Sequence, residues 1–364
     1  MTVDTTKRQD SGAAELPVAL PSGLTAQRQL PRWAVPGGLA ASAAVVGGLL
    51  AVVGFSTGLF VVGTAVVFTV GLYAASRAVE GRRKGTDRLV TSLVTTAFAI
   101  AMIPLVSLVY TVLDNGLARF DSAFFTNSMF RVVGEGGGAY HAILGTLIIT
   151  LLATVISVPI GLMTAIYLVE YGTGRLKKAI TFFVDVMTGI PSIVAGLFAF
   201  ALFTLLFGND VRLGIMGAVA LSVLMIPVVV RSCEEVLKLV PNELREASYA
   251  LGVPKWRTVV KVVLPTAIAG LGTGITLAVA RVVGETAPLL VTVGLITGTN
   301  LNPFDGRMAT LPVFAYYQLT QPGVDTQAFV DRAWTAALVL IILVMALNIV
   351  ARLISRFFAP KTGR

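Results

Sequence analysis

The stretch that decides the fold runs from residue 243 to residue 265 and reads Glu-Leu-Arg-Glu-Ala-Ser-Tyr-Ala-Leu-Gly-Val-Pro-Lys-Trp-Arg-Thr-Val-Val-Lys-Val-Val-Leu-Pro. It is rich in charge, but apolar runs long enough to cross a bilayer lie on both sides of it. Because charged side chains and unpaired backbone groups are not tolerated in the hydrocarbon of a membrane, this segment must lie at an aqueous surface. The sequence therefore predicts a membrane protein with a polar connection between two spans.

The composition of the 364 residues also predicts a membrane protein. Hydrophobic residues make up 55% of the chain and charged residues 13%, whereas about a quarter of the residues are charged in ordinary soluble domains. The net charge of +9 would suit nucleic acid, but the basic residues lie in short clusters beside apolar runs, so no nucleic-acid partner is predicted. The chain has one cysteine, Cys233, and one histidine, His141. These counts exclude a disulfide framework and argue against a metal site, and no cofactor is expected.

Eight apolar stretches have about the length that a membrane-spanning helix needs, so the predicted fold is all-α and polytopic. They lie at residues 36–55, 57–79, 90–113, 141–169, 181–207, 213–231, 265–293 and 334–354. Residues 1–35 are polar and rich in Pro, Gly, Ser and Thr, which predicts a disordered tail, and residues 356–364 form a second tail. The first two spans are dominated by Gly, Ala and Val and predict an accessory hairpin, followed by a basic loop, at residues 36–89.

The distribution of basic residues predicts the orientation in the membrane. Of the 28 Lys and Arg residues, 22 lie in the two tails and in the connections on the same side as the tails. The five on the opposite side are Arg119, Arg131, Arg212, Arg307 and Arg332, and Arg281 lies inside a span. Because basic residues are enriched in cytoplasmic loops, both termini and the segment at 243–265 are predicted to be cytoplasmic.

Within the polar connection, the residue pattern predicts a helix, a sharp turn and a second helix. Pro241 and Asn242 can begin the first helix, Gly252 suits a left-handed cap, and Pro254 suits the first turn of the next helix. The apolar positions at helical spacing are Leu244, Ala247 and Leu251. Such a helix could lie in a groove of a soluble partner, or it could rest at the membrane interface as an amphipathic connector. The spacing alone favours neither.

These residues resemble the Glu-Ala-Ala loop of permease subunits in binding-protein-dependent ATP-binding-cassette importers. The resemblance rests on Glu246, Ala247, Ser248, Gly252, Leu264 and Pro265, with Ser248 in place of a second alanine. It implies a six-helix permease core at residues 90–355, in which a coupling loop at 232–264 docks on a separate ATPase. The chain has no Gly-x-x-x-x-Gly-Lys-Ser/Thr loop to hold nucleotide phosphates. ATP hydrolysis is therefore expected on a partner chain, and this chain is not expected to be an enzyme.

Two opposite charges lie inside the seventh apolar stretch, in the run Ala280-Arg-Val-Val-Gly-Glu-Thr-Ala-Pro-Leu-Leu290. Arg281 and Glu285 are four residues apart, which predicts that they share one face of a helix. Exposure of either charge to lipid would cost several kcal/mol, so both must face protein or a water-filled path.

The two charges could neutralise each other as a structural ion pair. Alternatively, the planar guanidinium could bind a tetrahedral oxyanion, and the carboxylate could accept the proton that phosphate carries and sulfate lacks. Pro288 cannot donate a hydrogen bond to the carbonyl of Gly284, which predicts a bend between the two charges.

The same run resembles the Arg-x-x-Gly-Glu-Thr-Ala-Pro-Leu signature of the phosphate-specific subfamily of these permeases. This resemblance implies a phosphate path that includes Arg281, Glu285 and Pro288. A Gly-x-Pro-Ser motif of the family at residues 189–192 adds Pro191 and Ser192 as candidates for the lining of the path, although they could equally serve helix packing. The resemblance to the phosphate-specific subfamily further implies that this chain is the A-type permease of a larger complex. That complex would also contain a second permease subunit, two ATP-binding subunits and an extracytoplasmic phosphate-binding protein.

Two other functions remain open from the residues alone. A permease of the same superfamily for another substrate would keep the docking segment but would not need Arg281 and Glu285. An ion-gradient-driven transporter or a membrane scaffold would need no ATPase subunit.

Overall fold

The structure is a computed structural model that describes residues 30–209 and 211–358, and its regular elements in these ranges are all helices, as predicted. Most of the predicted tail at 1–35, and of the tail at 356–364, lies outside the described residues. The chain divides into two compact units between Ser107 and Leu108, within one long helix. The core boundary predicted near residue 90 stays a prediction.

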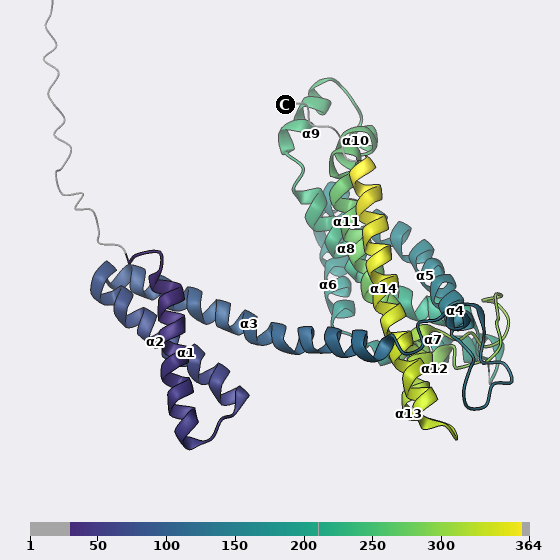
Figure 1. Cartoon of the computed structure of the whole chain (residues 1–364). Coiled ribbons are helices and arrows are strands. Elements are labelled where there is room, and N and C mark those ends of the chain that lie inside the picture. Colours follow the sequence, from purple (N-terminus) through teal and green to yellow (C-terminus); the bar gives the residue numbers. More distant parts are fainter. Residues whose placement is uncertain (1–29, 210, 359–364) are drawn as a thin grey trace, which may run out of the picture. The chain divides into compact units, whose positions relative to one another are not determined.

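The first unit contains α1 (Ala34–Val53), α2 (Thr57–Glu80) and most of α3 (Arg82–Gly116). α1 and α2 are joined by three residues and pack against each other as a hairpin (Figure 1). The predicted basic loop is helical, because α3 begins directly after Gly81, whose positive φ of 90° is a conformation that glycine adopts easily. The basic residues near the start of α3 therefore project from a helix.

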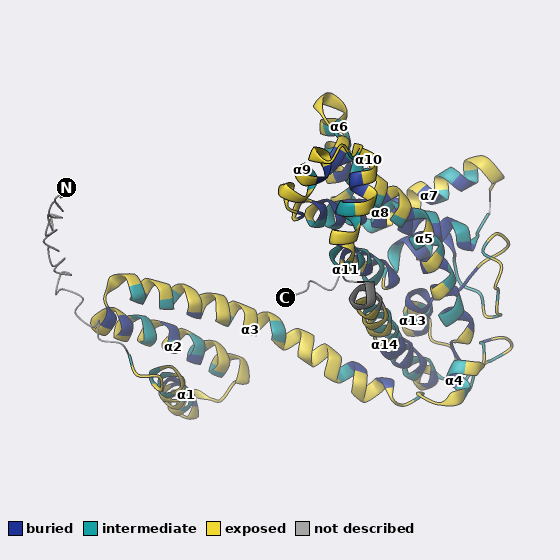
Figure 2. Ribbon diagram, turned by 90° about the horizontal axis from the view of Figure 1, so that it is seen from above, coloured by how far each residue is buried: buried dark blue, intermediate teal, exposed yellow. Residues whose placement is uncertain are grey.

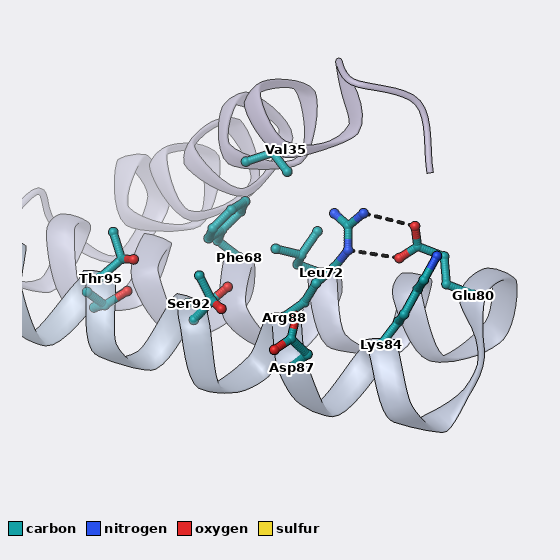
Figure 3. A pocket seen from close by; sticks show the side chains of 11 residues that line it. Val35, Phe68, Leu72, Glu80, Lys84, Asp87, Arg88, Ser92 and Thr95 are labelled. Atoms are coloured by element: carbon teal, nitrogen blue, oxygen red, sulfur yellow. Dashed lines mark hydrogen bonds and ion pairs between the residues drawn. The ribbon is translucent and has the colours of Figure 1, made fainter. Parts of the chain in front are cut away.

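Glu80 joins the ends of these helices. Its carboxylate accepts hydrogen bonds from Ser76 Oγ at 2.7 Å, from the Leu30 backbone N–H at 2.9 Å and from Arg88 Nη2 at 2.9 Å. Figure 3 shows Arg88 and Glu80 facing each other beside Leu72, at the edge of a cavity between α1, α2 and α3. The buried carboxylate is thus satisfied within this unit.

The second unit is built around α8 (Gly214–Lys238), which is the most buried of the candidate membrane spans. The helices α5 (Tyr140–Ile166), α7 (Ser192–Phe207) and α11 (Leu264–Val283) pack against α8. α14 (Thr326–Phe358) runs along α11 (Figure 1). The buried core consists mainly of Ala, Val, Leu and Met side chains from these helices.

The described residues contain seven helices that are long and apolar enough to span a membrane, together with one bent pair. This count agrees with the predicted eight, but one span differs in shape. The stretch predicted as a single span at 181–207 forms α6 (Gly174–Thr188) and α7, which meet at an angle of 107°. Gly189 and Pro191 lie at the break, where Pro191 adopts extended backbone angles and cannot donate a helical hydrogen bond.

The connections at the end of the second unit away from residues 243–265 contain two short helices, α4 (Ser122–Thr126) and α13 (Leu311–Thr320) (Figure 1). Here the fully buried guanidinium of Arg332 donates to the carbonyl oxygens of Gly134 and Gly136, at 2.7 and 3.0 Å. Arg119 donates to the carbonyl oxygen of Gly137 at 3.1 Å. Two arginines that the sequence predicts as outer-loop charges therefore hold the glycine-rich loop in place.

Candidate functional site

The polar segment at 243–265 forms a helix, a turn and a second helix, as predicted. α9 (Asn242–Ala250) is followed by α10 (Lys255–Thr258), which continues through the π-helical turn η2 (Val259–Val263) into α11. Pro254 lies directly before α10, where its fixed φ suits the start of a helix, and Pro265 follows η2 in the first turn of α11. The segment is thus made of helices joined by one short turn and is not an irregular loop.

Gly252 forms the turn between the two helices. Its φ is +73°, and its backbone N–H donates to the Tyr249 carbonyl at 2.9 Å, while the Val253 N–H donates to the Ser248 carbonyl at 3.2 Å. These two hydrogen bonds define a left-handed helix termination that favours glycine. A β-carbon at Gly252 would meet no atom within 4 Å, so the turn faces open space in the isolated chain.

The surface of α9 is exposed along most of its length (Figure 2). The side chains of Leu244 and Leu251 are 40% and 83% exposed, and Glu246 and Ala247 are exposed as well. This chain therefore covers the apolar positions of α9 only in part, which leaves them available to another protein or to the membrane interface.

Ser248 differs from the other predicted docking residues. It is buried, and its Oγ lies 2.8 Å from Thr258 Oγ1, which ties α9 to α10. Its hydroxyl is thus used within the chain, and the predicted part of Ser248 in coupling to an ATPase stays a prediction. Leu264 is half-buried and Pro265 is exposed at the start of α11.

Arg281 and Glu285 do not lie on one helix. α11 ends at Val283, Gly284 to Thr286 are not helical, and the short helix α12 (Ala287–Thr292) follows with Pro288 in its first turn. The helix-face prediction is wrong because the break expected from Pro288 is complete: it separates the two charges. Arg281 is exposed and Glu285 is half-buried.

The two charges are also unpaired. Among the residues that the structure describes, neither side chain forms a hydrogen bond or an ion pair. The alternative of a structural ion pair between Arg281 and Glu285 is therefore not realised in this conformation. A broken span that carries two unpaired charges is a place where an anion can be bound in a membrane.

The second broken span lies against the first. Pro191 and Ser192 begin α7, and one turn later Gly196 contacts α12 so closely that a β-carbon there would lie 2.6 Å from the Cα of Pro288. On the other side of α12, a β-carbon at Gly217 of α8 would lie 2.5 Å from Val293. Two glycines missed by the sequence analysis thus allow α12 to pack between α7 and α8. No sequence motif identifies these glycines, and only their close contacts with α12 in the structure show their role.

Replacing Gly196 with alanine is expected to push α12 away from α7, since a backbone atom occupies the site of the new methyl group. Overpacking of this kind costs about 1–3 kcal/mol. Thermal unfolding of the purified protein in detergent should show a lower transition temperature, and transport should fall. Gly48→Ala is the matched control: Gly48 also lies in a membrane-spanning helix, but its β-carbon would meet nothing within 4 Å. Equal stability of Gly196→Ala and the wild type would contradict the packing described here.

A helical membrane bundle with two broken spans near two unpaired charges of opposite sign, and with an exposed amphipathic helix at one end, has the features of an integral membrane transport subunit. The chain belongs to the family described as binding-protein-dependent transport system inner membrane component, whose model matches residues 157–364.

Individual relatives extend the likeness over more of the chain. It is 50% identical to phosphate transport system permease protein PstA 1 of Mycobacterium tuberculosis, over 78% of this chain and 91% of that protein. It is 37% identical to the phosphate transport system permease protein PstA of Yersinia pestis, over 77% and 92%. Among solved structures, a bacterial alginate ABC transporter chain matches with a TM-score of 0.54 at 14% identity, over 77% of this chain and 97% of that chain. The last comparison supports the fold alone.

Proposed function

We propose that the chain is the permease subunit of an ATP-driven importer of inorganic phosphate. It lies in the inner membrane as a multi-span transport subunit. The observation that carries the choice of phosphate is the presence of two unpaired charges, Arg281 in the last turn of α11 and Glu285 in the helix break that follows it. The similarity to permeases that are named for phosphate transport supports the same choice.

The chemistry of the two side chains suits phosphate. A guanidinium presents several N–H donors in one plane and can form paired hydrogen bonds with two oxygens of a tetrahedral anion. Glu285, within the break, would accept the hydrogen bond from the P–OH group. Sulfate has no such proton at neutral pH, so a carboxylate would repel it. Pro191, Ser192 and Pro288 would line the same path, and binding must stay weak so that phosphate can leave.

The exposure of Arg281 supports a second permease subunit. An arginine on a membrane-spanning segment cannot remain against lipid without a cost of several kcal/mol. In the isolated chain Arg281 is exposed. A second permease that packs on this surface would enclose the path between the two subunits, and an extracytoplasmic phosphate-binding protein would deliver the anion.

ATP hydrolysis on the partner subunits would be coupled to transport through α9. Its exposed residues Glu246 and Ala247, with the open turn at Gly252 and the start of α11 at Leu264 and Pro265, would dock on one of two ATP-binding subunits. The excess of basic residues on the side of this segment supports a cytoplasmic position for it and for both termini.

Two measurements test this function. Uptake of radiolabelled phosphate should be high in cells that carry the chain and its partner genes, and low in cells that lack only this chain. The purified chain should bring an ATPase subunit with it. Uptake of a different solute would favour another permease of the family, and purification without an ATPase would reject the importer.

A further inference from the structure

A buried ion pair joins the docking helix to a membrane-spanning helix. Glu170 lies in the π-helical turn η1 (Tyr167–Tyr171) at the end of α5, and Arg245 lies in α9, 75 residues further along the chain. Nε and Nη2 of Arg245 both donate to Oε1 of Glu170, at 3.0 and 2.8 Å. The two side chains are 12% and 4% exposed. This contact is thus internal, unlike the exposed residues around it on α9.

The same guanidinium also binds the end of α8. Its Nη1 donates to the carbonyl oxygen of Val240 at 2.6 Å, and its Nη2 donates to the carbonyl oxygen of Leu237 at 3.0 Å. Leu237 lies in the last turn of α8, where carbonyl groups have no helical partner. One side chain therefore connects three elements: α9, the end of α5 and the end of α8. The five donors of arginine in a rigid plane can do this, whereas the single ammonium of lysine cannot reach the same set.

Other cations near Glu170 are already engaged. Lys238 and Lys255 border the same cavity as Glu170 and Arg245. Lys238 forms an ion pair with Glu234 at 2.8 Å, and Lys255 lies over the ring of Tyr171. In the described part of the chain, Arg245 is the cation that pairs with Glu170. The joint is therefore a specific pair and not part of a diffuse cluster of charges.

We propose that the Arg245–Glu170 pair is the joint through which movement of α9 reaches α5 and α8. The inference rests on the proposed function, in which α9 docks on an ATPase. Ser248 ties α9 to α10, which continues through η2 into α11, whereas Arg245 ties α9 to the ends of α5 and α8. Without the ion pair, a displacement of α9 would still reach α11, but it would no longer be passed to α5 through a side-chain contact. Arg245 and Glu170 are positioning residues and touch neither phosphate nor ATP.

The test uses the complete complex in lipid vesicles, with phosphate-loaded binding protein outside and ATP at the cytoplasmic face. Phosphate transported per ATP hydrolysed is measured for Arg245→Met, Glu170→Met and the double variant. We expect each single variant to keep its ATPase subunit, because the exposed face of α9 is unchanged, and to transport at least about tenfold less phosphate per ATP. The double variant should be no worse than either single one, because both remove the same contact.

A matched control is Arg231→Met. Arg231 forms ion pairs with Asp185 and Glu234 at the same end of the unit, and Glu234 keeps Lys238 when Arg231 is removed. This variant should leave the ratio of phosphate to ATP unchanged. If Met at position 245 or 170 prevents assembly, Glu170→Gln keeps the shape and removes the charge, and it should lower the ratio in the same direction.

The outcomes separate the joint from the docking function. The proposed joint is rejected if the ratio of phosphate transported to ATP hydrolysed is unchanged in the single variants or falls equally in Arg231→Met. Additive losses in the double variant would also reject it. If the wild-type chain carries no ATPase at all, the proposed function itself fails, and that result is visible before any variant is measured.

Discussion

Replacing Gly252 with aspartate is expected to abolish phosphate uptake while the protein still folds and inserts into the membrane. The left-handed backbone at this position costs a residue with a side chain about 1–2 kcal/mol, which is small beside the roughly 5–15 kcal/mol of a typical folded protein. No atom lies within 4 Å of the new β-carbon, so no clash adds to this cost. The loss of function would therefore arise from impaired docking on the ATPase, because a charged side chain would project from the turn of the docking surface.

The chain offers a closely matched control for this prediction. Gly174, at the start of α6, has a φ of +66° and equally open surroundings. Gly174→Asp therefore carries the same backbone strain and the same charge outside the docking segment, and uptake should remain close to that of the wild type. Uptake, the amount of protein in the membrane and co-purification of the ATPase are measured for both variants. Normal uptake by Gly252→Asp would remove the turn from the docking surface, and equal losses in both variants would assign the effect to strain.

The fold could be predicted where one local property was enough. Apolar stretches located the spans, and Gly252 and Pro254 located the turn after α9, because both depend on the residues of a single segment. The same local reasoning missed the extent of two breaks. Pro288 was expected to bend a helix, but together with Gly284 it ends α11 and separates Arg281 from Glu285.

The residues that sequence reasoning missed act through contacts between distant segments. Glu170 and Arg245 are 75 residues apart, and the role of Gly196 follows from the position of Pro288, 92 positions later in the chain. Ser248 was identified only as a small residue in place of an alanine, and its hydrogen bond to Thr258 across the turn was not predicted. One sequence without a set of homologues carries no signal for such pairs. An acidic residue in the last turn of an apolar span, as at Glu170, was the nearest available sign that a partner exists.

Replacing Arg281 with glutamine is expected to lower phosphate uptake roughly tenfold or more. Each hydrogen bond to a charged group contributes about 1.5–3 kcal/mol, and 1.4 kcal/mol corresponds to a factor of ten. Glutamine keeps a donor but loses the charge and the planar fork, so Arg281→Lys, which keeps the charge, should fall between the two. Because Arg281 has no partner within the described residues, its removal leaves no buried group of this chain unpaired, and the protein should remain stable.

Transport assays in vesicles distinguish loss of the path from loss of coupling. Arg281→Gln should still bind its ATPase and hydrolyse ATP, because α9 is unchanged. Arg175→Gln removes an exposed arginine from α6 and should have no effect on uptake. Full phosphate uptake by Arg281→Gln would show that the anion is held elsewhere.

Glu285→Gln tests the choice of anion separately from its binding. A neutral amide can still accept a hydrogen bond from a P–OH group, but it no longer repels an anion that lacks a proton. Phosphate uptake should therefore fall less than in Arg281→Gln, while inhibition of that uptake by sulfate should rise. If sulfate competes no better with the variant than with the wild type, Glu285 does not select for the protonated anion. The two substitutions together would then assign the affinity to Arg281 and leave the selectivity to other residues along the broken helices α7 and α12.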